Sequence, residues 1–332
     1  MSLANKKVEE FENWYKDRLV HHEAARQFFC ELISGIPKVE MVRGRVKSYE
    51  ECLAKFRRKY LPMIEPQEID NGIQEYITDI IGIRAVCFYS DEVYEIRRNL
   101  KKFFKETDIS DKTGQLEKTD DKFGYKSLHL QLLLKNGLKE VPGADIFKGV
   151  TIELQVRTVI QDAWSILDHK IKYKKSIPQH LKRRINRLSA LFEIADDEFL
   201  SIQKGIIQEE LKINKRLKKG GKIETAQALD VFRFLFVALK HFPEYNFVEE
   251  EVDSFVQEIL EMKDDFTEGE LFEALDKNLI KVQQLEKLTM LSFSPYMAIK
   301  FCLHLSQVGD FEKILSADQL EIIQLLETGL RP

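Results

Sequence analysis

In the first half of the chain, the spacing of apolar and polar residues alternates between that of a helix and that of a strand. Apolar residues recur every three or four positions over residues 8–33, and the Ser-Gly-Ile-Pro stretch at 34–37 should end this helix. Residues 38–47 alternate as a strand does, and Ser48 is placed to cap a helix that runs to Tyr60. We therefore expect a helical arm, followed by a strand that leads directly into a helix.

The next apolar run is typical of a buried strand. It covers residues 80–89 and is rich in Ile, Val and Phe, and Asp91 then begins a helix to about Phe104. Two more strands and one more helix are expected at 127–134, 150–156 and 158–173. These mixed α and β elements are too interleaved for a β-sandwich and too irregular for a Rossmann sheet.

The last third of the chain has helical periodicity and a different charge. Residues 244–276 hold thirteen acidic residues and one Lys, and the helical spacing contains no regular repeat. A Gly pair inside the charged run 218–222 indicates a break, which places a domain boundary near 212–223. We predict a helical N-terminal arm, a mixed domain with trailing helices and an acidic all-α C-terminal domain, at 1–37, 38–211 and 223–332.

Composition narrows the class of protein. The chain has 332 residues, 44% of them hydrophobic, and a net charge of -4, which suits two soluble domains. No apolar run approaches the roughly 18 residues of a membrane span, and the N-terminus lacks the apolar core of a signal peptide. The four cysteines are scattered singly and predict neither a disulfide framework nor a paired metal site. A cytoplasmic location is the expectation.

Basic residues gather in two stretches that could bind phosphates. Residues 38–60 hold eight Lys or Arg against three Glu, and residues 168–187 hold eight against one Asp. The chain contains no Gly-rich dinucleotide fingerprint and no P-loop motif, so any phosphates must be held in another way.

Four cations in the first basic stretch are candidates for that task. Arg45 and Lys47 are two apart on a predicted strand and share its face, while Lys55 and Arg58 share one face of the next helix. All four could converge on one polyphosphate. The alternative is a solvated basic face, the usual explanation of Lys and Arg clusters.

Asp79 and Glu153 are the candidate metal ligands, because each lies at an end of an apolar strand where a lone carboxylate would be poorly solvated. Mg²⁺ prefers one or two carboxylates together with phosphate oxygens. Glu153 could also accept a proton from an attacking hydroxyl. Taken singly, Asp79 could instead be a helix or turn cap and Glu153 an edge-strand charge.

An aromatic residue and a histidine lie close together after Gly124. Tyr125 can present its ring from a loop for base stacking, and strand alternation puts Ser127 and His129 on the same side. The alternative is that Tyr125 packs in the core beside a hydrogen-bonded His129. Trp164, at helical spacing, is expected in the core.

Together, these segments resemble the RelA/SpoT-type alarmone synthetases. The resemblance covers about residues 39–174 and rests on motifs that follow one another along the chain: Gly44-Arg45-x-Lys47, Asp79-x-x-Gly82-x-Arg84, Gly124-Tyr125-x-Ser127-x-His129, Glu153-x-Gln155-x-Arg157-Thr158, and Trp164 with His169-x-x-x-Tyr173-Lys174. It implies a nucleotidyltransferase-like mixed β-sheet flanked by helices, and a synthetase domain over 38–211. It also implies transfer of the β,γ-diphosphate of ATP to the 3′ hydroxyl of GDP or GTP, with Mg²⁺ as cofactor and with (p)ppGpp and AMP as products.

The resemblance also implies roles for particular residues. Asp79 and Glu153 would be the catalytic, metal-binding carboxylates, Arg45 and Arg84 would sandwich adenine, and Tyr125 would stack on guanine. The remaining nucleotide-binding positions would be Lys47, Lys55 and Arg58 at the ATP phosphates, His129 at the acceptor, and Lys122, Gln155, Arg157 and His169.

Three residues depart from the family pattern. Glu51 stands where Ser is common, Asp121 where Lys is common, and Lys172 where Asn is frequent. No His-Asp dipeptide occurs, so we expect a small synthetase without a hydrolase domain. Two alternatives stay open: the acceptor is the 3′ end of tRNA, with residues 170–187 along its backbone, or the domain is an inactive nucleotide sensor. A homo-oligomer and a regulatory partner of the C-terminal domain are further hypotheses.

Overall fold

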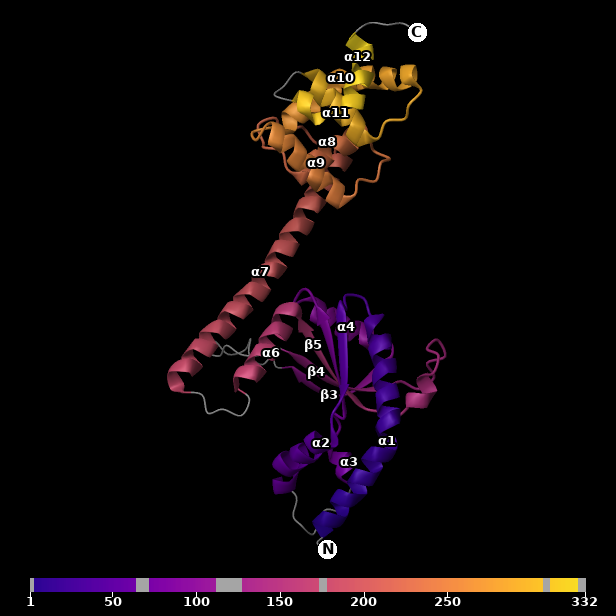
Figure 1. Ribbon diagram of the computed structural model, residues 1–332, viewed down its shortest axis with the longest axis vertical. Coiled ribbons are helices and arrows are strands. Elements are labelled where there is room, and N and C mark those ends of the chain that lie inside the picture. Colours follow the sequence, from indigo (N-terminus) through magenta and orange to yellow (C-terminus); the bar gives the residue numbers. More distant parts are fainter. Residues whose placement is uncertain (1–2, 64–71, 112–126, 173–177, 307–310, 328–332) are drawn as a thin grey trace. The chain divides into compact units, whose positions relative to one another are not determined.

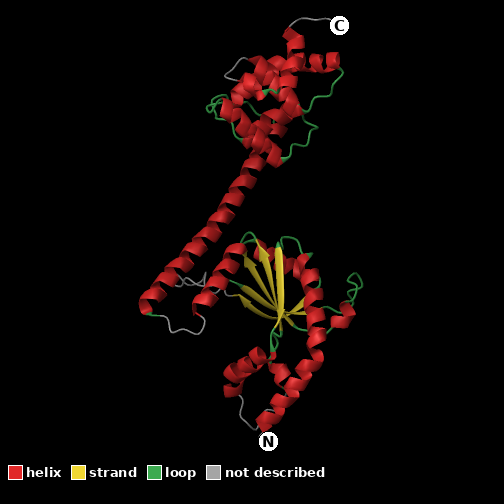
Figure 2. Cartoon of the chain, in the orientation of Figure 1, coloured by secondary structure: helices red, strands yellow, loops and turns green. Residues whose placement is uncertain are grey.

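The computed structural model describes residues 3–63, 72–111, 127–172, 178–306 and 311–327 (Figure 1). Contacts within the chain divide it into two units, Met1–Ile202 and Gln203–Pro332, and the division falls inside helix α7 (Gln179–Lys218). The five-stranded sheet belongs to the first unit, and the second unit is helical (Figure 2). The predicted α+β fold with an all-α C-terminal region is confirmed, whereas the three-part domain division stays a prediction.

A mixed sheet of five strands is the framework of the first unit. Its strands are β1 (Met41–Val46), β2 (Ile81–Cys87), β3 (Phe104–Asp111), β4 (Leu128–Leu134) and β5 (Ile152–Thr158), in the spatial order β1-β2-β5-β4-β3. Strands β2 and β5 pair in parallel, and every other neighbouring pair is antiparallel. The parallel pair therefore lies inside the sheet, with β1 and β3 at its edges.

Helices α1 (Leu3–Ser34) and α4 (Glu92–Leu100) pack on one face of this sheet. Phe29 of α1 and Ile96 of α4 are fully buried in a cluster that includes Ile83 and Leu154, because alternate strand residues point to this apolar face. The remaining elements of the first unit are α2 (Tyr49–Lys55), the π-helix η1 (Phe56–Tyr60), the 3-10 helices η2 (Leu61–Met63) and η3 (Ala144–Phe147), α3 (Ile73–Tyr76), and α6 (Val159–Lys172).

The contact of α1 with β1 depends on a glycine. A Cβ on Gly44 would lie 2.5 Å from Cys30 Sγ and 2.9 Å from Arg26 Cγ, both on α1. The absence of a side chain lets helix and strand approach closely. Further along α1, the Tyr15 hydroxyl donates a hydrogen bond of 2.8 Å to the Lys47 carbonyl, so α1 also fixes the chain just after β1.

A second, smaller core connects the first half of α1 to α2, η1 and α3. Phe11, Cys52, Phe56 and Ile73 are buried in it. Ser48 begins α2 as predicted, and its hydroxyl and the Glu51 carboxylate form a capping box. This small core holds α2 and η1 beside the end of β1.

The structure corrects three of the predicted elements. The helix after Asp91 ends at Leu100, and Phe104 begins strand β3 instead of ending that helix. The helix capped by Ser48 is α-helical only to Lys55 and continues as a π-helix. The first strand begins at Met41 because Lys38 has a φ of 72°, outside the extended region. The strand β3 has an edge position and few apolar residues, so its sequence carries a weak strand signal.

The second unit is a bundle of short helices around an aromatic core. Its elements are the end of α7, α8 (Val231–His241), α9 (Glu249–Met262), α10 (Glu268–Thr289), α11 (Pro295–Ser306), the 3-10 helix η4 (Phe311–Ile314) and α12 (Ala317–Glu327). The fully buried carboxylate of Glu268 lies 2.7 Å from Arg216 on α7 and 3.8 Å from Arg233 on α8. This ion-pair cluster joins α7 to the bundle. Within the described ranges, no helix is both long and apolar enough to cross a membrane.

We expect Leu154→Ala to lower the free energy of unfolding of the first unit by about 2–5 kcal/mol, because it leaves a cavity in the fully buried core of the sheet. Ile109→Ala, on the edge strand with 42% of its surface exposed, should cost less than about 1 kcal/mol. Tryptophan fluorescence during denaturation isolates this unit, because both tryptophans, Trp14 and Trp164, belong to it. Equal losses for both variants would contradict the assignment of the core.

Candidate active site

The face of the sheet opposite α1 and α4 is lined with polar side chains in two rows. In one row Arg45, Gly82, Glu153 and Gln131 are neighbours on β1, β2, β5 and β4. In the next row Arg43, Arg84, Gln155 and His129 are neighbours on the same strands. We call this surface the polar face. Residues two apart on a strand share a face, so the described strand residues of the predicted motifs lie on one surface.

A cavity of about 1610 Å³ opens over the polar face, and we call it the sheet cavity. Its walls come from β1, α2, η1, β2, β5 and α6. The predicted site residues among its lining are Arg45, Lys47, Arg58, Asp79, Arg84, Glu153, Gln155 and Arg157. Two other predicted residues contact this set: Lys55 pairs with Asp79, and His129 pairs with Glu153. The motifs that are far apart in sequence therefore meet in one place.

Asp79 is the most heavily paired carboxylate of the sheet cavity. Its Oδ2 accepts from Lys47 and lies 2.7 Å from Lys55 Nζ. Burial alone would raise the pKa of Asp79, but the hydrogen bonds from the two lysines outweigh burial and lower this pKa. Asp79 binds these lysines from the segment before β2, so its carboxylate does not act as a helix cap. It is a buried, ionised group between two cations.

Glu153 lies on the central strand β5, so it is not an edge-strand charge. Its Oε1 lies 3.0 Å from His129 Nδ1 and accepts a hydrogen bond of 3.0 Å from Gln155 Nε2. The contact with His129 lowers the pKa of Glu153 to about 2 in spite of its burial. The carboxylate is thus ionised at neutral pH, which suits a cation ligand and makes it a weak proton acceptor.

Two arginines of the sheet cavity meet at one carboxylate of α6. Arg84 Nη1 and Arg157 Nη1 lie 3.3 Å and 3.2 Å from Asp162 Oδ1. Burial lowers the pKa of Arg157 to about 10, which still leaves it charged at neutral pH. Arg157 also donates to Gln155 Oε1 and, at 2.8 Å, to Ser165 Oγ. These contacts fix its guanidinium within the wall of the cavity.

Glu51, which departs from the family pattern, has a local structural role. Its backbone N–H donates to Ser48 Oγ (3.2 Å), and its carboxylate accepts from the Ser48 backbone N–H (3.1 Å). The other carboxylate oxygen lies 3.4 Å from Arg45 Nη1. Both side chains are at least half exposed, so water screens this ion pair. Glu51 therefore caps α2 and touches one of the predicted nucleotide-binding arginines.

Some predicted site residues are not described. Lys122 and Tyr125 lie outside the described residues, as does Asp121, and so do the side chains of His169 and Lys172. Ser127 is buried and accepts a 3.4 Å hydrogen bond from Arg157 Nε. Trp164 is buried against Phe192 of α7, with ring centroids 5.3 Å apart, which confirms its predicted core position.

Sequence reasoning missed several residues of this site, among them Arg43, Asp162 and Ser165. Arg43 lines the cavity two positions before Arg45, a spacing that strand alternation could have revealed. Asp162 and Ser165 face Arg157 from the helix that follows β5, and no signal in the sequence identifies them. Their roles depend on how α6 turns back over the end of the strand.

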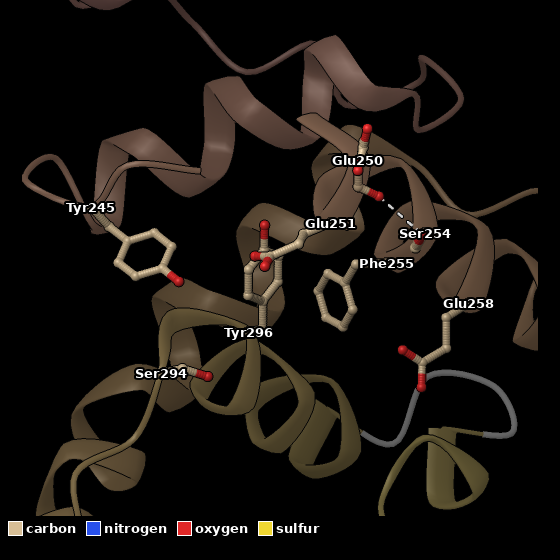
Figure 3. Close-up of a pocket in the computed structure, with 8 residues that line it drawn as sticks. All are labelled: Tyr245, Glu250, Glu251, Ser254, Phe255, Glu258, Ser294 and Tyr296. Carbon is tan, nitrogen blue, oxygen red and sulfur yellow. Dashed lines mark hydrogen bonds between the residues drawn. The ribbon is translucent and has the colours of Figure 1, made fainter. Parts of the chain in front are cut away.

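A second cavity, of about 670 Å³, lies in the helical unit (Figure 3). Figure 3 shows Tyr245, Phe255 and Tyr296 among the residues that line it, together with Glu250 and Glu251. Burial, together with Glu251, raises the pKa of Tyr296 to about 12. Its described lining contains carboxylates and aromatic rings but no Lys or Arg, so it is unsuited to phosphates.

Two of the carboxylates of the sheet cavity, Asp79 and Glu153, fit a divalent cation. Asp79 Oδ1 is buried and has no hydrogen-bond partner among the described residues. A Cβ on Gly82 would meet no atom within 4 Å, so the space beside Glu153 on the polar face is open. No cluster of three or more metal-ligating side chains occurs in the described part of the chain. Mg²⁺ in proteins is commonly held by one or two carboxylates together with ligand phosphates.

The charge pattern of the sheet cavity defines a class of protein: one that binds an anionic, polyphosphate-containing ligand on a mixed sheet. Comparison with known proteins agrees with this class. Residues 44–178 match the region found in RelA / SpoT proteins. GTP pyrophosphokinase YjbM of Bacillus subtilis (strain 168) is 32% identical over 188 residues, which cover 55% of this chain and 81% of that protein. The chain belongs to the RelA/SpoT family.

Two further comparisons name proteins that are similar to this chain. GTP pyrophosphokinase YwaC of Bacillus subtilis (strain 168) is 28% identical over 177 residues, or 53% of this chain and 79% of that protein. The crystal structure of small alarmone synthetase 1 from Bacillus subtilis is 28% identical and covers 59% of this chain and 99% of its own, with a TM-score of 0.47. The family match ends at residue 178 and so leaves the helical unit outside it.

We expect inorganic tripolyphosphate to bind the purified chain in the absence of metal, and Arg58→Met to weaken this binding roughly tenfold because it removes a charged donor from the cavity wall. Titration calorimetry at several salt concentrations measures the effect, and binding should weaken as salt rises. Lys148→Met removes an exposed cation that is absent from the cavity lining and should leave binding unchanged. Equal effects of the two substitutions would indicate diffuse attraction to the whole surface.

Proposed function

We propose that this chain is a GTP/GDP pyrophosphokinase. It transfers the β,γ-diphosphate of ATP to the 3′ hydroxyl of GDP or GTP and releases AMP and (p)ppGpp. The 3′ oxygen forms a bond to the β-phosphorus, the bond from that phosphorus to the oxygen of the α-phosphate breaks, and the hydroxyl proton is lost. The observation that carries the proposal is the convergence of Asp79 and Glu153 with basic residues in the sheet cavity. Membership of the RelA/SpoT family and the names of both curated relatives support it.

The donor nucleotide is assigned to the side of the cavity formed by β1, α2 and η1. Arg45 and Arg84 are both at least 39% exposed, so their planar guanidinium groups are available to stack on adenine. Lys47, Lys55 and Arg58 are assigned to the phosphates. Positioning and charge neutralisation account for most of the catalysis of phosphoryl transfer, so this reaction needs no nucleophilic side chain.

Asp79 and Glu153 would hold Mg²⁺, which when bound neutralises charge on the transferred diphosphate. The low pKa of both carboxylates supports this role, because each is ionised at neutral pH. It also argues against Glu153 as the final acceptor of the hydroxyl proton, which passes to solvent in this scheme.

Lys47 and Lys55 have two roles in this scheme: they pair with Asp79 in the free protein and bind the phosphates of ATP. Without a ligand they neutralise Asp79. When ATP binds, its phosphates offer both lysines alternative anions, and the Asp79 carboxylate becomes available to a cation. Because a buried carboxylate without a counter-charge is costly, the lysines stabilise the free protein in a form that is ready for ATP.

The acceptor nucleotide is assigned to the side of β4. His129 lies in the polar face beside Glu153 and would orient the acceptor, with Tyr125 stacked on guanine. Lys122, Gln155, Arg157 and His169 complete the proposed set. Gln155 and Arg157 bond to each other, so they would act as one unit.

The helical unit is proposed as a regulatory module. It contains the acidic stretch 244–276, opposite in charge to the sheet cavity, and this complementarity motivates the proposal. A homo-oligomer, a regulatory partner and a cytoplasmic location remain predictions. Removal of residues 223–332 without any change in activity or assembly would contradict a regulatory role.

The test of the proposed function is incubation with Mg²⁺ and γ-labelled ATP, plus GDP, GTP or deacylated tRNA separately. We expect label on the guanine nucleotide together with AMP, and a loss of roughly 10²–10³-fold in Asp79→Asn and Glu153→Gln, because each removes charge at the reacting centre. Chelation of the metal should abolish transfer.

Asp145→Asn is the matched control for these variants, since Asp145 is an exposed carboxylate of the same unit that is absent from the cavity lining. It should retain full activity. Label only on tRNA would show that the acceptor is RNA. ATP binding without transfer to any acceptor would show that the chain is a nucleotide sensor and not an enzyme.

Glu51→Gln should lower the KM for ATP about threefold, because it removes a negative charge beside Arg45 while glutamine can still close the capping box. Glu75→Gln is the control: Glu75 is also the third residue of its helix but is absent from the cavity lining. Steady-state kinetics with varied ATP measure the effect. A raised KM would mean that Glu51 orients Arg45 instead of competing for it.

A further inference from the structure

Asp162 joins two guanidinium groups that extend from neighbouring strands. It lies in the first turn of α6, and its side chain is only 12% exposed. Its Oδ1 lies 3.3 Å from Arg84 Nη1 of β2 and 3.2 Å from Arg157 Nη1 of β5. One carboxylate oxygen thus serves two cations, and neither comparison with relatives nor sequence reasoning assigned it a role.

The two arginines need this carboxylate for different reasons. Arg157 is 3% exposed, so its charge is buried and requires compensation. Arg84 is 39% exposed and could otherwise extend into water. The two strands are paired so that Arg84 is beside Gln155, two residues from Arg157, and like charges this close repel each other. Asp162 offsets that repulsion.

Among the described residues, Arg157 forms more side-chain hydrogen bonds than Arg84 does. The Arg157 guanidinium also donates to Gln155, Ser127 and Ser165. For Arg84, the pair with Asp162 is the one side-chain hydrogen bond or ion pair found among the described residues. Loss of the carboxylate should therefore release Arg84 first, while Arg157 keeps its neutral partners.

We propose that Asp162 is a positioning residue for the donor nucleotide: it holds the Arg84 guanidinium in place over the polar face, where the proposed function has it stack on adenine. This inference rests on that proposed function. Asp162 itself touches neither nucleotide in this scheme. It acts through Arg84, which lines the sheet cavity. An ion pair at the edge of a guanidinium leaves the flat face of that group available for stacking.

The test compares Asp162→Asn and Asp162→Glu with the unaltered chain. Asp162→Asn keeps the shape and removes the charge, and we expect the KM for ATP to rise roughly tenfold. Asp162→Glu keeps the negative charge but displaces it, so the rise in the KM for ATP should be smaller than in Asp162→Asn. The KM for GDP should change less than the KM for ATP in both variants, because Arg157, which is assigned to the acceptor, keeps its neutral partners Gln155, Ser127 and Ser165.

Glu106→Gln is the matched control. Glu106 is a carboxylate of similar exposure, 15%, and accepts hydrogen bonds from Arg97 Nε and Nη2 at 2.8 Å and 3.1 Å, outside the sheet cavity. It should lower the melting temperature without altering the KM for ATP. If Asp162 only stabilised the fold, Asp162→Asn would likewise lower the melting temperature without altering the KM for ATP. That result would overturn the proposal.

A double-mutant cycle gives the sharper criterion. If Asp162 acts through Arg84, Asp162→Asn should change the KM for ATP by less than twofold in a chain that already carries Arg84→Ala. If the effects of the two single substitutions on the KM for ATP multiply in the double variant, the proposal is overturned. If Asp162→Asn does not fold, Asp162→Glu decides: an unchanged KM for ATP in that variant also overturns it.

Binding of a non-hydrolysable ATP analogue, measured by calorimetry, separates this proposal from the proposed function. Weaker analogue binding in Asp162→Asn supports the positioning role even if the unaltered chain transfers no diphosphate. Unaltered analogue binding in Asp162→Asn overturns the role of Asp162 even if the unaltered chain is an active pyrophosphokinase.

Discussion

The parallel pairing of β2 with β5 is the constraint on which the site depends. These strands are about seventy residues apart in sequence, yet their register sets Gly82 beside Glu153 and Arg84 beside Gln155. One face of both strands is buried under α1 and α4, so a shift by one residue would exchange the apolar and polar faces. The core therefore specifies the register, and the register assembles the site.

The charges of the site are compensated in separate groups along the polar face. Asp79 pairs with the lysines that follow β1 and end α2, Asp162 pairs with two arginines, and Glu153 is held by His129 and Gln155. Each carboxylate lies against its own donors, which lets a strongly charged surface fold without a ligand. A nucleotide with its cation would redistribute these pairs among new partners.

Much of this arrangement could be predicted from local patterns. Alternation placed Arg45 and Lys47 on one side of a strand, Ser48 capped α2, and the motifs around Asp79 and Glu153 proved to line one cavity. Strand β3 escaped prediction because an edge strand with few apolar residues resembles a loop or a helix end. Asp162 escaped because its partner arginines lie on strands that only the fold makes neighbours.

The sequence alone determined most of the kinds of element, the acidic character of the helical unit and the candidate chemical groups of the site, because periodicity and side-chain chemistry are local properties. The tertiary structure decided which strands are neighbours, that Glu153 is central and not at an edge, and which cation each carboxylate binds. Those outcomes depend on pairing between distant segments and on burial against α1 and α4. Both are set by the packing of the whole unit, which no short stretch of sequence encodes.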